Sequence, residues 1–352
     1  MAPSTAADRA REAVVRLCAS DADLRTLRVR LLEAVGRTVP FDAYAWVLTD
    51  PDTTVGSSPL AAVPSLAELP RLIRLRYVTP VNRWTALGEL PVARLADTTR
   101  GRLEQSLLWR ELLSRYDVSD VASVVFRDRY GCWAFLELWR TGGRTFTTDE
   151  SAFLADVAPA VTAALRAGQA RTFAVTPARR HLSGPLVLQL SPGLDVVRQT
   201  ADTRDPLRVL VPRDDDGPTV PAGAYNVGAQ LLAVESGVDP HPPMTRVHLA
   251  GGLWLTLRAA RLEEMVPSAD RDIAVTIEES TPAERVGLFT RAAGLSEREA
   301  ELVGHLAEGS DTREIAQRMF LSAHTVQDHL KSVFTKTGTR SRRTLLARAL
   351  GS

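Results

Sequence analysis

The fold of the C-terminal part of the chain is decided by its last 58 residues, LSEREAELVGHLAEGSDTREIAQRMFLSAHTVQDHLKSVFTKTGTRSRRTLLARALGS (295–352). Four stretches with apolar residues at helical spacing each follow a residue that favours a helix N-terminus; these residues are Ser296, Asp311, Ser322 and Ser341. Glutamates stand three positions after the first two, at Glu299 and Glu314, which is the spacing of a capping box. The segment therefore predicts a small bundle of four helices.

A turn of three residues, Phe320–Leu321–Ser322, separates the second and third predicted helices. This spacing predicts a helix-turn-helix, in which the helix over 322–337 lies in the DNA major groove. Charge supports this interpretation, because the six basic residues and one acidic residue of 320–352 give a net charge of +5. The preceding stretch, 296–319, has three basic and six acidic residues and a net charge of −3. Both lysines of the chain, Lys331 and Lys336, lie in the positive part.

The same segment resembles a LuxR-type helix-turn-helix domain. The matching residues are Leu295, Ser296, Arg298, Glu299, Leu306, Ala307, Glu308, Gly309, Glu314, Ile315, Ala316, Leu321, Ser322, Thr325, Val326, His329, Leu330, Lys336, Gly338 and Arg342. The resemblance implies that Gln327, Asp328 and Lys331 read bases. It further implies that phosphates are faced by Ser322, Thr325, Lys336 and Arg340, and that the fourth helix supports dimerisation.

The sequence departs from this family pattern at four positions. Gln327 stands where the family often has a lysine, and Asp328 where a neutral residue is common. Thr337 and Thr339 replace aliphatic residues. Glutamine can pair with adenine and aspartate can accept from cytosine N4. The departures should therefore change which site is read more than whether DNA is bound.

Upstream of the bundle, residues 20–168 predict a mixed α+β domain. Helices are expected over 24–36, 65–78, 102–116 and 148–167, and strands over 41–50, 121–128 and 132–140. Thr147 with Glu150 has the capping-box spacing at the start of the last helix. The element order resembles a GAF domain, most specifically in the hairpin followed by RTFTTDESAFLADVAPAVTAALR (144–166).

A second β-rich module is predicted over 183–280, after a linker at 169–185. Its strands are expected at 186–190, 194–199, 245–262 and 272–279, with a two-glycine hairpin at Gly251–Gly252 and a helix over 225–237. Strands at both ends with a helix between them suggest a reduced PAS-like sheet. A capped helix over 281–294 then leads to the terminal bundle.

Composition excludes several classes of function. The 352 residues are 45% hydrophobic and 24% charged, with a net charge of +1, as in a globular protein of two or three domains. No lysine precedes Lys331, which excludes a P-loop, a Schiff-base lysine and the usual phospho-receiver site from the first 330 residues. The six histidines show no metal-binding spacing, and the Asp214–Asp215–Asp216 run is expected to be a solvated loop. The protein is not expected to be an enzyme.

Cysteine usage and the N-terminus indicate the compartment. Cys18 and Cys132 lie too far apart in sequence for a disulfide framework, which suits a reducing environment, and Cys132 is expected to be buried as a small hydrophobe. The N-terminus lacks the apolar core of an export signal, and no apolar run is long enough to span a membrane. We therefore expect a cytoplasmic protein.

Together these patterns predict a multi-domain transcription regulator. Its α+β GAF-like sensor domain (20–168) and PAS-like domain (183–280) are followed by a linker helix (281–294) and an all-α four-helix LuxR-type domain (295–352). The expected partners are double-stranded DNA, a second copy of the chain and RNA polymerase, and no membrane. No cofactor is expected. The five tryptophans at 46, 84, 109, 133 and 139 form either core or an aromatic pocket for an unidentified small molecule.

Two alternatives stay open. The N-terminal modules can be ligand-free dimerisation scaffolds in a DNA-binding regulator whose activity follows its abundance. The terminal bundle can instead belong to an adaptor that binds another regulator.

Overall fold

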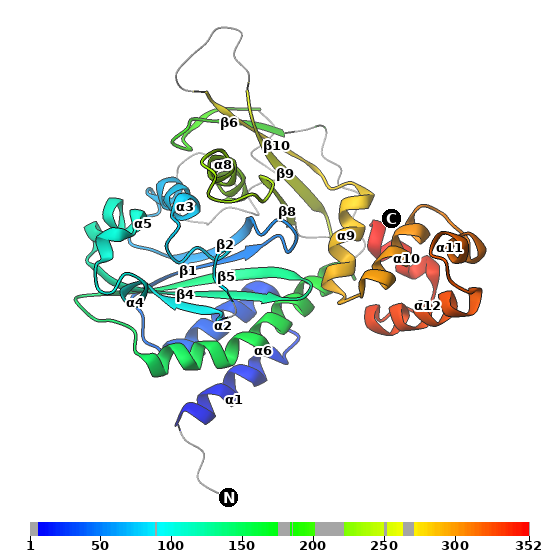
Figure 1. Ribbon diagram of the computed structural model, residues 1–352, viewed down its shortest axis with the longest axis horizontal. Helices are drawn as coiled ribbons and strands as arrows, with labels where there is room; N and C mark the ends of the chain where they lie inside the picture. Colours follow the sequence, from blue (N-terminus) through cyan, green and yellow to red (C-terminus); the bar gives the residue numbers. More distant parts are fainter. Residues whose placement is uncertain are drawn as a thin grey trace, which may run out of the picture. The chain divides into compact units, whose positions relative to one another are not determined.

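The computed structural model describes residues 6–88, 90–174, 184, 186–200, 222–249, 252–262 and 271–351 (Figure 1). The Asp214–Asp215–Asp216 run and most of the predicted linker at 169–185 lie outside these residues. Contacts divide the chain into two compact units. The first comprises 1–165, 184–247 and 256–278, and the second comprises 166–183, 248–255 and 279–352.

The first unit contains a five-stranded antiparallel sheet in the order β2-β1-β5-β4-β3. Its strands are β1 (Ala43–Thr49), β2 (Gly56–Ala62), β3 (Val92–Arg94), β4 (Val118–Asp128) and β5 (Gly131–Thr141). The helices α1 (Ala6–Cys18), α2 (Leu24–Gly36) and α6 (Thr148–Thr172) lie on one side of this sheet (Figure 1). The short helices α3 (Leu69–Val78), α4 (Leu95–Thr98) and α5 (Leu107–Glu111) lie on the other side (Figure 1).

A second five-stranded sheet follows in the chain. Its strands are β6 (Leu186–Leu190), β7 (Val196–Gln199), β8 (Met244–His248), β9 (Trp254–Arg261) and β10 (Ile273–Glu279), in the order β7-β6-β10-β9-β8. Numbered one to five along the chain, the strands of both sheets are arranged 2-1-5-4-3. In each case helical structure separates the second strand from the third, and in the second sheet this is α8 (Ala222–Glu235). The chain thus builds the same strand arrangement twice.

Two buried ion pairs join segments of the first unit that are distant in sequence. Arg246 on β8 donates to both carboxylate oxygens of Asp50, through Nε at 2.6 Å and Nη2 at 2.7 Å. Arg83 donates to Asp239 at 2.8 Å through Nη2. All four side chains are at most 5% exposed. A buried charge stripped of its partner is strongly destabilising, so these pairs constrain how the two sheets pack.

The tryptophans of the first unit belong to its core. Trp46, Trp84, Trp133 and Trp139 are at most 2% exposed, and Trp84 stacks on Phe135 with ring centroids 4.4 Å apart. The core interpretation is therefore confirmed for these four residues, whereas Trp109 is half-buried and packs against the edge of the core. Cys132 is also buried, as expected for a small hydrophobe, and burial raises the pKa of its thiol.

The second unit is mainly helical. It contains α9 (Pro282–Ala292), α10 (Glu297–Ala307), α11 (Thr312–Arg318), α12 (Ala323–Thr337) and α13 (Arg342–Leu350). Within this unit Arg285 of α9 donates to the Gly252 carbonyl at 3.1 Å and the Arg348 carbonyl at 3.4 Å, and its guanidinium lies over the Phe173 ring. The predicted linker helix is thus a packed helix, with Val286, Leu288 and Phe289 buried.

The predicted single helix over 102–116 is wrong. The segment instead forms a 3₁₀ turn (Leu103–Gln105), α5 and a second 3₁₀ turn (Leu113–Tyr116). Leu112 leaves the helical region at φ −133°, and both Leu112 and Leu113 are at most 2% exposed. In a continuous helix, the side chains of Leu112 and Leu113 would point about 100° apart around the helix axis. The break in the helix lets both side chains enter the core.

Most other predicted elements are confirmed, with shifted ends. The final helix of the first module runs to Thr172 rather than 167, and its capping box between Thr147 and Glu150 is formed. The glycine hairpin is formed by β8 and β9, although Gly251 lies outside the described residues. The sequence did not predict α1, β2 or β3. No helix in the described ranges is long and apolar enough to cross a bilayer.

Candidate nucleic-acid interface

The four C-terminal helices begin where the sequence predicts. Ser296 and Asp311 each form a complete capping box, with Glu299 and Glu314. Ser322 and Ser341 each accept a hydrogen bond from the backbone three residues on, at Thr325 and Thr344. Such a cap contributes about 1 kcal/mol. The inward faces form one buried core; its members include Leu302, Val303, Leu306, Ile315, Met319, Val326, Leu330, Val333 and Leu345.

Helix α12 has a buried face and an exposed polar face. Val326, Leu330 and Val333 are at most 2% exposed and pack inward. The exposed face carries side chains at helical spacing, namely His324, Gln327, Asp328, Lys331 and Thr335. At 100° per residue the centres of the two faces lie roughly 150° apart around the helix. Three of the predicted site residues, Gln327, Asp328 and Lys331, thus share one outward face.

Asp328 lies between two basic side chains on this face. Its carboxylate is 3.4 Å from Lys331 Nζ and 3.5 Å from His324 Nε2. All three side chains are more than half exposed, so solvent screens these pairs. Gln327 makes no side-chain hydrogen bond within the described part of the chain. A ligand can therefore reach all of these groups without disturbing the core.

Ser322 and Thr325 lie at the N-terminus of α12. The Ser322 hydroxyl accepts from the Thr325 amide at 3.1 Å, and the two hydroxyls are 2.9 Å apart. Ser322 is exposed and Thr325 is half-buried. Both predicted phosphate-facing residues therefore also stabilise the helix end.

Lys336 contacts the protein on a different flank of α12. Its ammonium donates to Glu299 Oε2 at 2.6 Å, and Ser332 donates to Glu299 Oε1 at 2.6 Å. Burial alone would raise the pKa of Glu299, but these hydrogen bonds and the capping contact with Ser296 hold it at about 2. Lys336 is thus a bridge between α10 and α12, and its side chain is only about one-third exposed.

The remaining cations divide into two groups. Arg342 donates to the Thr312 hydroxyl, and Arg348 donates to the Thr337 carbonyl at 2.9 Å. Arg340 and Arg343 are exposed and have no ion-pair or side-chain hydrogen-bond partner among the described residues. Arg340 therefore remains available for the phosphate contact that the family resemblance implies, which stays a prediction, whereas Arg343 was not predicted as a site residue. The cluster of arginines from Arg340 to Arg343 in the sequence could have indicated Arg343 as a further site residue.

The turn before α12 presents an exposed aromatic residue. Phe320 is 94% exposed and has φ +55°, a conformation that non-glycine residues rarely adopt. Sequence reasoning placed Phe320 in the turn but gave it no role. His324 was also not predicted as a site residue, although its i, i+4 spacing to Asp328 places both on one face of α12.

Comparison with known proteins identifies this region. Residues 293–349 match the GerE family, the bacterial regulatory proteins of the luxR family. The C-terminal segment is a LuxR-type helix-turn-helix domain. The match runs from residue 293 through α10, α11, the turn Phe320–Ser322 and α12 to residue 349, one residue before the end of α13.

One curated relative and two solved structures show similarity to parts or all of this chain. The probable HTH-type transcriptional regulator GfsR of Streptomyces halstedii is 40% identical over 67 residues, which make up 19% of this chain and 28% of the relative. The chain thus spans little more than a quarter of that relative's length in the match. Among solved structures, SdiA in complex with octanoyl-rac-glycerol aligns over 100% of this chain and 97% of its own, with 11% identity and a TM-score of 0.36. A crystal structure of Escherichia coli SdiA aligns over 97% of both chains, with 12% identity and a TM-score of 0.34.

Proposed function

We propose that the protein is a sequence-specific DNA-binding regulator of transcription. The observation that carries this proposal is the outward face of α12 within a LuxR-type domain, where Gln327, Asp328 and Lys331 lie opposite the buried face. Helix α12 enters the major groove, which admits an α-helix and exposes the hydrogen-bonding edges of the bases. The net charge of +5 over 320–352 attracts the phosphate backbone.

The side chains on this face suit particular bases. Gln327 pairs with adenine, Asp328 accepts from cytosine N4, and Lys331 donates to guanine O6 or N7. In the free protein Asp328 lies near Lys331 and His324, so DNA has to replace these weak, solvent-screened contacts. The phosphates are contacted by Arg340, Ser322 and Thr325. The main role of Lys336 is its ion pair with Glu299, and a phosphate contact is its secondary role.

The two sheets of the first unit serve as GAF-like and PAS-like sensor modules in this proposal. Their shared 2-1-5-4-3 strand arrangement supports a pair of related modules. A signal acts on them, and two copies of the chain engage two half-sites of a roughly palindromic operator. The proposed modules span 20–168 and 183–280, and the DNA-binding module spans 295–352.

Selection from a random duplex library tests the proposal with the full-length protein. We expect one enriched, palindromic site. Gln327→Ala and Asp328→Ala should each relax the base preference at one position by roughly 1–3 kcal/mol. Arg298→Ala is the matched control, because Arg298 is exposed on α10 and paired with Glu301 at 2.9 Å.

The outcomes separate the proposed function from the adaptor interpretation. Relaxed preference at single positions in the α12 variants, with an unchanged site for Arg298→Ala, supports direct base reading. Selection without any enriched sequence, or the same site in all variants, contradicts it.

A further inference from the structure

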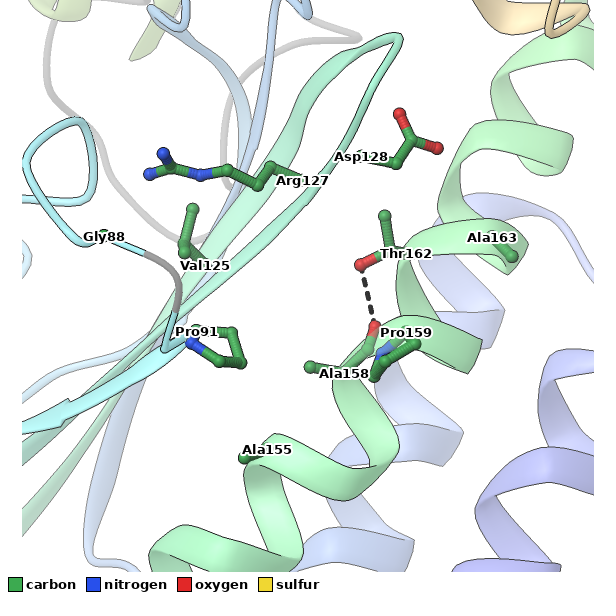
Figure 2. A pocket seen from close by; sticks show the side chains of 10 residues that line it. All are labelled: Gly88, Pro91, Val125, Arg127, Asp128, Ala155, Ala158, Pro159, Thr162 and Ala163. Carbon is green, nitrogen blue, oxygen red and sulfur yellow. Dashed lines mark hydrogen bonds between the residues drawn. The ribbon is translucent and has the colours of Figure 1, made fainter.

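Two hollows meet at the end of β4, within the first unit. The larger, of about 520 Å³, lies between β4 and α6 (Figure 2). The smaller, of about 230 Å³, is lined by Trp84, Thr85 and His241 among others. Arg127 and Asp128 line both. The two hollows therefore share one charged border.

The larger hollow exists because α6 presents small side chains to the sheet. Figure 2 shows Val125 and Pro91 on one side of the gap and the α6 residues on the other; these are Ala155, Ala158, Pro159, Thr162 and Ala163. The Thr162 hydroxyl is used within the helix, donating to the Ala158 carbonyl at 2.7 Å. The wall along α6 is thus apolar, and among the residues that the structure describes no large side chain fills the space. Its volume lies within the range of small-molecule sites.

The charged border favours an anion. Arg127 is exposed, its Nη2 donates to the Trp84 carbonyl, and it has no carboxylate within ion-pair distance among the described residues. The Asp128 carboxylate is held by hydrogen bonds from other groups: its Oδ1 accepts from the Trp133 indole at 3.0 Å and from the Tyr130 amide at 2.9 Å. An arginine without an ionic partner beside an apolar wall suits a carboxylate or a similar anionic group.

The smaller hollow adds an oriented histidine. His241 Nδ1 lies 2.7 Å from Asp239 Oδ1, and Asp239 is itself held by Arg83 and Thr85. These contacts fix the imidazole at the edge of the hollow, about one-third exposed. The other ring nitrogen has no partner among the described residues and is left for a polar group of a ligand.

We propose that these hollows form one binding site for a small amphipathic anion. The apolar body of the ligand lies between Val125 and the small residues of α6. Its anionic group contacts Arg127, which lines the smaller hollow together with His241. This site goes beyond the proposed DNA-binding function and does not depend on it. It assigns a ligand class to the first unit, where the sequence left an unidentified small molecule open.

Titration of the full-length protein with anilinonaphthalene sulfonate tests the site, because this fluorescent probe combines apolar rings with one anionic group. We expect a single saturable site. Arg127→Gln should weaken binding by about tenfold or more, which corresponds to at least about 1.4 kcal/mol. Ala163→Leu should weaken binding, because it adds bulk at an exposed position on the rim of the larger hollow.

Two matched controls keep the test specific. Arg129→Gln removes a neighbouring exposed arginine that lines neither hollow and stacks on Tyr130. Ala167→Leu adds the same bulk one turn farther along α6, outside both hollows. Circular dichroism shows whether each variant folds. If Ala163→Leu does not fold, the comparison of Arg127→Gln with Arg129→Gln still tests the proposed site. Equal binding by Arg127→Gln and Arg129→Gln, or no binding by the unaltered protein, overturns the proposal whatever the DNA measurements show.

Discussion

Glu299 of α10 and Lys336 of α12 form a 2.6 Å ion pair that ties the first and third helices of the LuxR-type domain together. The carboxylate side chain is only 6% exposed and also accepts from Ser332 and from the Ser296 amide. One glutamate therefore completes a helix cap and fixes the orientation of the proposed recognition helix. The pair connects the stability of the domain with the position of its DNA-facing side chains.

Lys336→Met should lower the free energy of unfolding by about 1–3 kcal/mol, because it leaves the buried Glu299 carboxylate without its cation. Lys336→Arg should recover most of the loss. Urea unfolding followed by circular dichroism measures both. An unchanged midpoint in Lys336→Met would show that the ion pair does not hold the helices.

The same carboxylate predicts a pH dependence. The pKa of Glu299 is about 2 in the folded chain, against an ordinary value of 4.5. Its contribution to stability is therefore fully present above about pH 4.5 and is lost as the pH falls from 4.5 toward 2, where the unfolded chain takes up the proton first. The gap in unfolding free energy between the unaltered protein and Glu299→Gln should narrow over that window. A gap that stays constant from pH 6 to pH 3 would contradict this assignment.

Much of the terminal domain was predictable because its signals are local. The caps at Ser296, Asp311, Ser322 and Ser341 depend on residues no more than three positions apart, and all four are formed. The partner of Lys336 was not predictable, since Glu299 lies 37 positions away and only the packing of α10 on α12 brings the two together. From the sequence, Lys336 was therefore expected to face a phosphate, and its ion pair with Glu299 inside the domain was not foreseen.

The first unit shows the same limit on a larger scale. The hairpin of β4 and β5 was evident from two apolar runs around Gly131, whereas β2 has the sequence GSSPLAA and lacks the β-branched residues typical of strands. Its pairing with β1 depends on tertiary context. The repeated strand arrangement and the ion pairs between distant segments are likewise properties of the assembled fold.

Asp50→Asn should destabilise the first unit by about 3–5 kcal/mol, because Arg246 would lose the charge that its guanidinium and backbone amide both contact. Asp52→Asn is the matched control, since Asp52 is 45% exposed and 3.5 Å from the same arginine. Differential scanning calorimetry compares the two variants. Similar melting temperatures for both would rule out a structural role for the buried pair.

In the proposed function, the outward face of α12 and the cations after it bind duplex DNA. Fluorescence anisotropy of the full-length protein with its selected duplex, between 50 and 200 mM salt, tests this most directly. Affinity should fall steeply with salt, and Arg340→Ala should reduce the logarithmic slope by about 0.9, as expected for one lost phosphate contact. Lys331→Ala should weaken binding, while Arg298→Ala should not. Affinity that is insensitive to salt, or equal in all variants, would show that this face of α12 does not bind DNA.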